Sequence, residues 1–271
     1  MVSTGSSDVV AQLRRAGCVF AEEEADLLAI AAAETGSDLE QLVAQRVSGT
    51  PLEHLVGWVE FHGLRVGVAP GVFVPRQRTG FLVDEAAALA RVQGLDRPVV
   101  VDLCCGSGAL GLALATVLAA EGRTVDLSAA DIEPAAVDCA RRNLAPLGAH
   151  VYAGDLFDPL PTDLRGRIDI LLCNTPYVPT DMIARMPPEA RDHEPRRALD
   201  GGPDGLDILR RVAAAAPSWL APCGHLLVEE SETQAPVAAA ILRQQGLNAR
   251  ITESDEHYAT VVIGTAPVGR T

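Results

Sequence analysis

The fold is decided by the stretch VVVDLCCGSGALGLALA, residues 99–115. Its first residues form a continuous apolar run around Asp102, which is typical of a strand buried on both faces of a sheet. The loop with Gly106 and Gly108 follows, and a helix-like stretch then runs from Gly108 to about Ala120. Glycines between a buried strand and a helix let a ligand approach the backbone near the helix N-terminus. By itself the loop also fits a tight turn, and no G-K-[ST] follows to make it a phosphate-binding loop.

Outward from this stretch, strand-like and helix-like segments alternate, which predicts a parallel sheet with helices on both faces. Further strands are expected over 124–131, 150–153, 168–173 and 225–230, and helices over 134–144, 206–220 and 234–245. Two last strand-like segments, near 247–253 and 258–264, are too close together for a helical crossover. They are therefore expected to form an antiparallel hairpin.

The N-terminal part follows a different pattern. Residues 1–57 are predicted to form a small helical bundle, whose third helix carries an apolar face at Leu39, Leu42, Val43 and Val47. Ser37 and Glu40 fit a capping box at the start of that helix, and Gly49 and Pro51 end it. Residues 58–76 alternate with a period of two, which predicts a β-hairpin linker. The expected domains are thus 1–57, the linker 58–76 and an α/β domain over 77–271.

Two polar motifs follow predicted strands of the α/β domain. Asp131 ends the strand after the glycine loop, where open α/β sheets place a carboxylate for ribose hydroxyls, although a helix N-cap ahead of Pro134 is an alternative. Asn174-Thr-Pro-Tyr177 follows the strand IDILLC. Thr175 is pushed toward an extended conformation by Pro176. The Asn174 side-chain oxygen and the Thr175 carbonyl are then expected to accept from one planar NH₂ group against the Tyr177 ring, and a plain turn is the alternative.

Composition limits the classes of function. The 271 residues carry a net charge of −14, and all 22 basic residues are arginines, which makes bulk nucleic-acid binding unlikely. No apolar run is long enough for a membrane span, and the first residues show no signal peptide. The six cysteines form no C-x-x-C pair, so we expect no metal site and reduced thiols in a cytoplasmic protein.

Together these motifs resemble the protein-(glutamine-N5) methyltransferases, the HemK group, which methylate the glutamine of the GGQ motif in peptide release factors. The resemblance extends over nearly the whole chain, and the stretch 193–211 is its most specific part. It is carried by FHGLRVGVAPGVFVPRQRTGFLVDEA (61–86), VDLCCGSGALGLALA (101–115), AADIEPAAVDCARRN (129–143), GDLFDPLP (154–161), NTPYVPT (174–180) and HEPRRALDGGPDGLDILRR (193–211). The resemblance implies a Rossmann-like class I methyltransferase domain that uses S-adenosyl-L-methionine and releases S-adenosyl-L-homocysteine.

The resemblance also implies roles for individual residues. Asn174, Thr175, Pro176 and Tyr177 match the N-P-P-Y motif that grips the substrate amide, with Thr175 in place of the first proline. By this resemblance, Asp131 holds the ribose hydroxyls of the cofactor, and Asp155 lies near its adenine. The full cofactor set implied is Asp102, Cys104, Gly106, Ser107, Gly108, Asp131, Ile132, Asp155, Leu156 and Asn174.

Several departures mark a divergent member of this group. Cys104 stands at the usual first glycine of the loop, and Gln77 and Gly80 replace a proline and a glutamate. Glu229-Glu230-Ser231 stands where the group often has Glu-Ile-Gly. A release factor is the expected partner, but another protein glutamine, an exocyclic amine of a nucleic-acid base and an inactive cofactor-binding module remain alternatives. The arginine-rich stretch from Arg185 to Arg197 fits a lid, a docking surface or a plain loop paired with its own acids.

Overall fold

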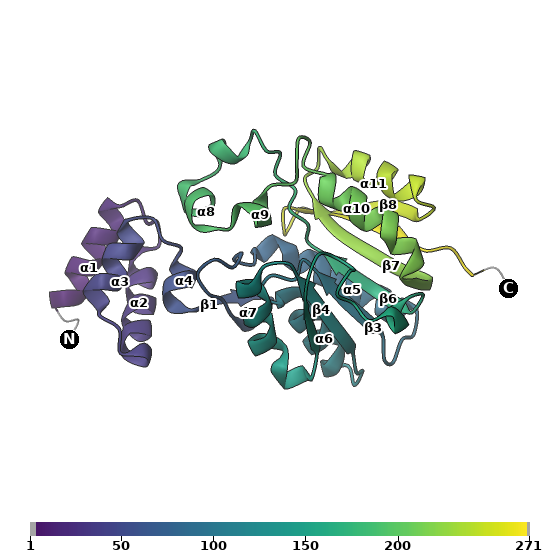
Figure 1. The fold of residues 1–271 in the computed structure, drawn as a ribbon. Helices are drawn as coiled ribbons and strands as arrows, with labels where there is room; N and C mark the ends of the chain where they lie inside the picture. Colours follow the sequence, from purple (N-terminus) through teal and green to yellow (C-terminus); the bar gives the residue numbers. More distant parts are fainter. Residues whose placement is uncertain (1–3, 270–271) are drawn as a thin grey trace.

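A computed structural model describes residues 4–269, and its larger part is an α/β domain built on one sheet (Figure 1). Within the described residues, seven strands pair in the order β5-β4-β3-β6-β7-β9-β8. Their bounds are β3 Val99–Leu103, β4 Asp126–Asp131, β5 His150–Ala153, β6 Ile168–Cys173, β7 Leu220–Glu230, β8 Asn248–Ser254 and β9 Ala259–Thr265. The first five are parallel, and β9 inserts antiparallel between β7 and β8. The predicted Rossmann-like sheet and its final hairpin are confirmed.

Helices cover both faces of the sheet, as the alternation predicted. On one face lie α5 Gly80–Val92, α6 Ala109–Ala120 and α7 Pro134–Leu144, and on the other lie α10 Asp207–Ala215 and α11 Ala235–Gln244. Consecutive strand residues point to opposite faces. Leu172 accordingly belongs to the same apolar cluster as Leu114 of α6, whereas its neighbour Leu171 belongs to the cluster that includes Leu209 of α10. The sheet is therefore buried on both faces by apolar side chains.

The order in which successive strands are added to the sheet changes direction at β3. The chain runs from β3 outward to β4 and β5, and then returns to β6 on the other side of β3. Ligands of open α/β sheets bind outside the carboxyl ends of the strands at such a point. Leu103, the last residue of β3, pairs with Ala130 of β4 and with Cys173 of β6. The loops after these three strands therefore begin at the same level.

The N-terminal helices are α1 Thr4–Arg15, α2 Ala21–Thr35, α3 Leu39–Val47 and the short α4 Leu52–Val56. They share a separate apolar cluster that includes Leu13, Leu28 and Val43, and lie to one side of the α/β domain (Figure 1). The predicted cap at Ser37 is wrong. Asp38 is the N-cap, because its carboxylate accepts from the Glu40 N–H at 3.0 Å, whereas the Ser37 hydroxyl pairs with Thr35.

The linker forms a hairpin, but a shorter one than predicted. β1 Trp58–Phe61 pairs with β2 Leu64–Gly67 through a turn at His62 and Gly63. Strand pairing ends at Gly67 although the prediction extended to 76. Pro70 and Pro75 lack a backbone N–H, which removes donors that a longer ladder needs.

Short elements complete the described chain. The predicted helix 206–220 ends early, at Ala215, because Pro217 cannot continue it, and β7 then begins at Leu220 instead of 225. The remaining segments are α8 Pro188–His193, α9 Arg196–Leu199 and single 3₁₀ turns η1 Gln77–Thr79, η2 Ala145–Leu147, η3 Thr162–Leu164, η4 Ile183–Arg185 and η5 Ala216–Ser218. Between residues 4 and 269, no helix has the length and apolar character needed to cross a membrane.

Candidate functional site

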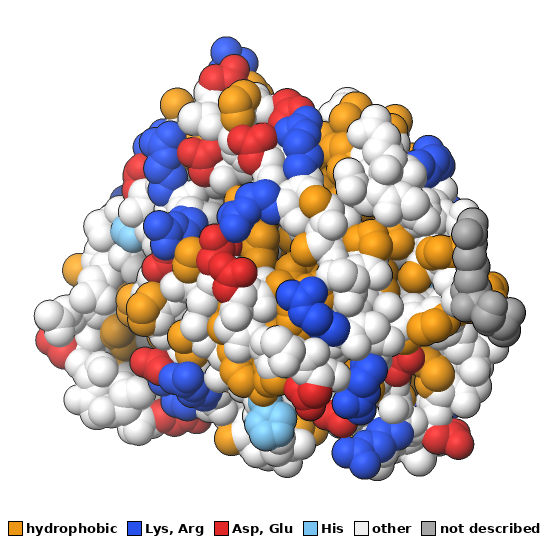
Figure 2. Space-filling view, turned by 45° about the vertical axis from the view of Figure 1, so that its right-hand side comes forward, with side chains coloured by type: hydrophobic (Ala, Val, Ile, Leu, Met, Phe, Trp, Pro, Cys, Tyr) orange, Lys and Arg blue, Asp and Glu red, His pale blue; other side chains and the backbone are white. Residues whose placement is uncertain are grey.

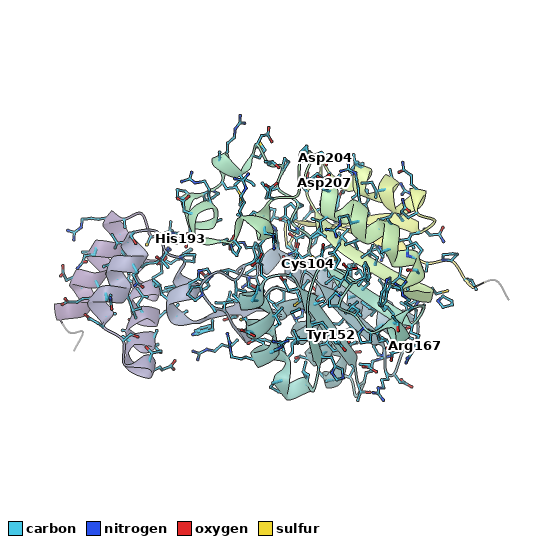
Figure 3. All side chains as sticks on the ribbon, in the orientation of Figure 1. Cys104, Tyr152, Arg167, His193, Asp204 and Asp207 are labelled. Carbon is cyan, nitrogen blue, oxygen red and sulfur yellow. The ribbon has the colours of Figure 1, made fainter. Side chains whose placement is uncertain are left out.

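A cavity of about 460 Å³ opens at the carboxyl ends of β3, β4 and β6, a volume within the range of small-molecule sites. Most of the predicted site residues line it together: Cys104, Gly106, Ser107, Asp131, Ile132, Asp155, Leu156, Asn174, Thr175, Pro176 and Tyr177. Figure 3 shows Cys104 near the centre of the molecule, where β3 ends. Asp102 and Gly108 are not part of the lining.

The two glycines of the loop have different roles. Gly106 has a φ of +55°, and a Cβ built on it meets no atom within 4 Å, so its backbone faces open space. Its N–H donates to the Asp131 carboxylate at 2.8 Å. A Cβ on Gly108 would instead lie 3.0 Å from Leu144 Cδ1. Gly108 therefore allows α7 to pack against the loop, and Gly106 keeps the ligand side open.

Asp131 is fixed by two backbone donors at the cavity wall. One carboxylate oxygen accepts from Gly106 N, and the other accepts from Glu133 N at 2.9 Å. Burial raises the pKa of Asp131, and these hydrogen bonds oppose that shift. The N-cap of α7 is Glu133, so the alternative assignment of Asp131 as the cap is wrong. Each Asp131 oxygen keeps a lone pair for a hydroxyl group in the cavity.

Asp102 lies fully buried beneath the loop and not in the cavity wall. Its Oδ2 accepts from the Gly111 N–H in the first turn of α6 at 2.9 Å. Its Oδ1 has no hydrogen-bond partner among the residues that the structure describes. Burial raises the pKa of Asp102 to about 8. Asp102 thus anchors the helix start that follows the glycine loop.

The Asn174–Tyr177 segment presents a free acceptor beside a fixed aromatic ring. The buried Asn174 Oδ1 has no hydrogen-bond partner within residues 4–269. The Tyr177 hydroxyl donates to Glu229 Oε1 at 3.3 Å and accepts from the Arg78 guanidinium. Burial raises the pKa of Tyr177 to about 12, which keeps the phenol protonated. An unpartnered buried acceptor costs free energy unless a ligand donor reaches it.

The segment around Gly201 and Gly205 holds the Asn174–Tyr177 backbone in place. Cβ atoms on these glycines would lie 2.5 Å from the Pro176 carbonyl oxygen and 2.2 Å from that of Tyr177. The Val178 N–H also donates to the Leu199 carbonyl at 3.0 Å. The glycine-rich sequence GGPDG (201–205) marked this stretch as specific, but its contact with the motif was not predicted.

A buried ion pair joins the linker to the stretch before α9. The Arg76 guanidinium contacts both Glu194 carboxylate oxygens at 2.7 Å, and Val74 N donates to the same carboxylate at 3.3 Å. The Glu194 side chain is only 1% exposed. This pair, which the sequence did not predict, positions the linker and the α8–α9 segment along one wall of the cavity.

The arginine-rich stretch is largely paired with acids. Arg191 contacts Asp192, Arg196 contacts Asp200 at 3.2 Å, and Arg197 contacts Glu133 at 3.1 Å. Of these three arginines, only Arg197 lines the cavity. On the face drawn in Figure 2, acidic and basic side chains are interspersed. Two of the arginines thus fit the plain-loop interpretation, and Arg197 lines the cavity together with its partner Glu133.

These features fit S-adenosylmethionine. Gly106 offers a close backbone approach, and Asp131 offers acceptors for hydroxyl groups, whereas Glu133, which also lines the cavity, is paired with Arg197. Asp155 also pairs with Arg211 at 2.7 Å. Within the described residues, no group of three potential metal ligands is placed to hold a metal ion.

The fold and the cavity define an S-adenosylmethionine-dependent methyltransferase. Residues 64–186 match the family model for the methyltransferase small domain. Among solved structures, the Thermus thermophilus 16S rRNA N2 G1207 methyltransferase, in complex with AdoMet and guanosine, superposes with a TM-score of 0.53 at 18% identity. That match covers 77% of this chain and 49% of the other. A methyltransferase from Pyrococcus furiosus gives a TM-score of 0.52 at 13% identity, covering 76% of this chain and 90% of the other. Both likenesses show the fold.

Sequence comparison identifies the family to which this methyltransferase belongs. The release factor glutamine methyltransferase of Geobacter sulfurreducens is 36% identical over 225 residues, which cover 82% of this chain and 75% of that protein. The enzyme of the same name from Mycolicibacterium smegmatis is 42% identical over 72% of this chain and 66% of its own length. The chain belongs to the release factor glutamine methyltransferase family. It spans about two thirds of the length of several of these relatives.

One similar protein carries a different name. The 4-amino-L-phenylalanine/4-methylamino-L-phenylalanine methyltransferase of Streptomyces pristinaespiralis is 37% identical over 210 residues. The match covers 75% of this chain and 69% of that protein. Proteins similar to this chain therefore carry names for different substrates.

Proposed function

We propose that this protein transfers a methyl group from S-adenosylmethionine to the side-chain amide nitrogen of a glutamine in a protein, namely the GGQ glutamine of a peptide release factor. The observation that carries the proposal is the buried, unpartnered Asn174 Oδ1 beside the Tyr177 ring within the described cavity. A planar NH₂ group supplies the donor that this acceptor lacks. The names of the relatives from Geobacter sulfurreducens and Mycolicibacterium smegmatis support a release factor as the substrate.

The proposed mechanism relies on orientation. An amide nitrogen is a poor nucleophile because its lone pair is delocalised. Asn174 Oδ1 accepts from the amide N–H, which orients the nitrogen and favours the positive charge that develops on it. Tyr177 packs against the planar face of the amide, and Asp131 and the Gly106 backbone hold the cofactor end of the cavity. The bound cofactor would supply a sulfonium methyl and leave as S-adenosylhomocysteine, and one amide proton is released to solvent. Alignment of acceptor and methyl contributes the proximity effect.

A small aromatic amine is the second candidate substrate. The relative from Streptomyces pristinaespiralis, at 37% identity, is named for a free amino acid with an aromatic amine. Such an amine also presents a planar NH₂ group to Asn174. Relatives named for each of the two substrates are similar to this chain, so the acceptor must be tested directly.

The bundle of residues 1–57 is proposed to dock the protein substrate, because none of its described residues, 4–57, lines the cavity. It contacts the stretch before α9 through Arg46, which lies 2.8 Å from Glu189 of α8. Figure 3 shows His193, at the end of α8, facing the helical bundle. We also propose a cytoplasmic location, which the six free thiols support.

The test separates an enzyme from a binding module. Asn174→Ala should abolish methyl transfer to the release factor, while calorimetry still detects S-adenosylhomocysteine binding. Asn248→Ala, on the exposed side of β8, is the matched control and should keep both properties. Wild-type protein that binds the cofactor but methylates neither release factors nor aromatic amines would overturn the enzymatic proposal in favour of a binding module.

A further inference from the structure

A second cavity of about 380 Å³ lies next to the first. The two cavities share Arg78 and Tyr177, which therefore form the wall between them. Glu229 and Glu230, at the end of β7, and Tyr258, before β9, are among its other lining residues. None of the residues implied in cofactor binding lines this second cavity.

Glu230 is the unexplained group in the second cavity. Its residue is 3% exposed, and neither carboxylate oxygen has a hydrogen-bond partner among residues 4–269. Its neighbour Glu229 differs, because Glu229 Oε1 lies 2.9 Å from Arg78 Nε and accepts from the Tyr177 hydroxyl. Burial without donors is costly for a carboxyl group. The buried Glu230 carboxyl, which lacks donors in the protein, is therefore a candidate for ligand binding.

The charges around Glu230 select the kind of ligand. Burial raises the pKa of Glu230 to about 8, and the negative charges of Glu229 and Asp204 add to the shift. Arg78, which lines this cavity, is already engaged by Glu229 and by the Tyr177 hydroxyl. A further anion would be repelled, whereas a cation with several donors would satisfy both Glu230 oxygens.

We propose that the second cavity is a subsite for a primary ammonium group of the acceptor molecule, held by Glu230. An ammonium group carries three N–H donors and a compact charge. This inference rests on the proposed methyl transfer at Asn174, because the shared wall of Arg78 and Tyr177 places the subsite beside the acceptor end of the first cavity. The ammonium group has two possible sources, a lysine side chain of a protein substrate or the α-ammonium of a free amino acid.

The first experiment detects the subsite without any methyl transfer. Protein labelled with ¹³C at the glutamate carboxyl groups is titrated with acid and base, with and without ethylammonium chloride as the probe. The ammonium ion should lower the pKa of Glu230, because it stabilises the ionised form. Acetamide, a neutral donor, should produce less than a third of that shift. Glu230→Gln removes the resonance and assigns it, and Glu253→Gln, on the exposed part of β8, should keep the shift. A Glu230 titration that ethylammonium leaves unchanged would overturn the proposal.

The second experiment identifies the source of the ammonium group. Methyl transfer is measured with a release factor, with 4-amino-L-phenylalanine and with 3-(4-aminophenyl)propanoate, which lacks the α-ammonium. Glu230→Gln should raise KM at least about tenfold for the substrate whose ammonium it binds, with kcat little changed, because one partner of a buried charge pair is lost. An effect on the release factor identifies a lysine, and an effect on the amino acid but not on the propanoate identifies the α-ammonium. Unchanged KM for every methylated substrate would refute the subsite. Absence of all methylation would refute the proposed function alone, since the ethylammonium titration still reports on Glu230.

Discussion

The Nε atom of Arg78 lies 2.9 Å from the Glu229 Oε1 atom, and the same guanidinium donates to the Tyr177 hydroxyl. Arg78 belongs to the turn η1, whereas Glu229 belongs to β7, so the contact joins residues 151 positions apart. The Glu229 side chain is 3% exposed. This pair fixes the ring that forms one side of the acceptor site.

The first prediction concerns this pair. Arg78→Ala should lower kcat by about 10- to 100-fold, because small displacements of an aligned group are costly to catalysis. It should also lower the melting temperature, because Glu229 loses the cation that compensates its buried charge. Kinetics and thermal unfolding measure the two effects. Arg250→Ala removes the exposed pair with Glu85 and serves as the control. Equal kcat for the Arg78→Ala variant and the wild type would contradict the positioning of Tyr177.

The second prediction concerns pH. Asp102 and Glu230 have pKa values of about 8 in the folded protein, against ordinary values of 3.8 and 4.5. Between pH 5 and 8 the folded state therefore binds more protons than the unfolded state. The free energy of unfolding should fall as pH rises through this range, by up to about 1.4 kcal/mol per pH unit for each group. Urea unfolding at several pH values measures the slope. Glu230→Gln should show a shallower slope than the wild type, and an unaltered slope would argue against the buried, protonated carboxyl.

The third prediction concerns the glycine support of the motif. Gly205→Ala should abolish most activity, because its Cβ would lie 2.2 Å from the Tyr177 carbonyl oxygen and push the motif away. Gly246→Ala is a matched control, since Gly246 has a φ of +84° against +81° for Gly205 but no atom within 4 Å of a built Cβ. Backbone strain should cost both variants about 1 kcal/mol of stability, and the clash should add to the loss in Gly205→Ala. Only Gly205→Ala should lose methyl transfer as well, and equal activity of the two variants would refute the role of the close contact.

The fourth prediction concerns the helical bundle. Val19 and Phe20, between α1 and α2, are 81% and 64% exposed, which is unusual for large apolar side chains standing together. The double change Val19→Ser and Phe20→Ser should raise KM for a full-length release factor about three- to tenfold through the loss of apolar contact area. KM for 4-amino-L-phenylalanine should not change. Val92→Ser, at an 85% exposed position of α5, is the control. Unchanged KM for the release factor would show that docking does not use this surface.

Most of the fold could be predicted because its pattern is local. The apolar run that ends at Leu103 and the later alternation of strand-like and helix-like segments determine the sheet and its two helix layers. Errors occurred where a neighbouring residue changed an element end. Pro217 shortens α10, and Asp38 replaces Ser37 as a cap because a carboxylate was one position closer to the helix.

The site was predicted only where a motif follows a strand. Asp131 ends β4, Asn174 directly follows β6, and Gly106 lies in the loop after β3, so their meeting follows from the parallel sheet. The contacts of Arg78 with Glu229 and of Arg76 with Glu194 join residues more than 100 positions apart. Such pairs leave no periodic pattern in one sequence. In the sequence, Glu229 stood out only as a departure from the family pattern, and Glu194 only as part of the specific stretch 193–211. Neither observation indicated the arginine that pairs with the glutamate.

The position of the transferred methyl group identifies the acceptor atom. A release factor is incubated with this protein and S-adenosylmethionine, and its peptides are sequenced by mass spectrometry, with Asn174→Ala in parallel. We expect one added methyl on the side-chain nitrogen of the GGQ glutamine, absent with Asn174→Ala. An unmodified GGQ peptide, alongside methylation of 4-amino-L-phenylalanine, would contradict the proposed protein substrate.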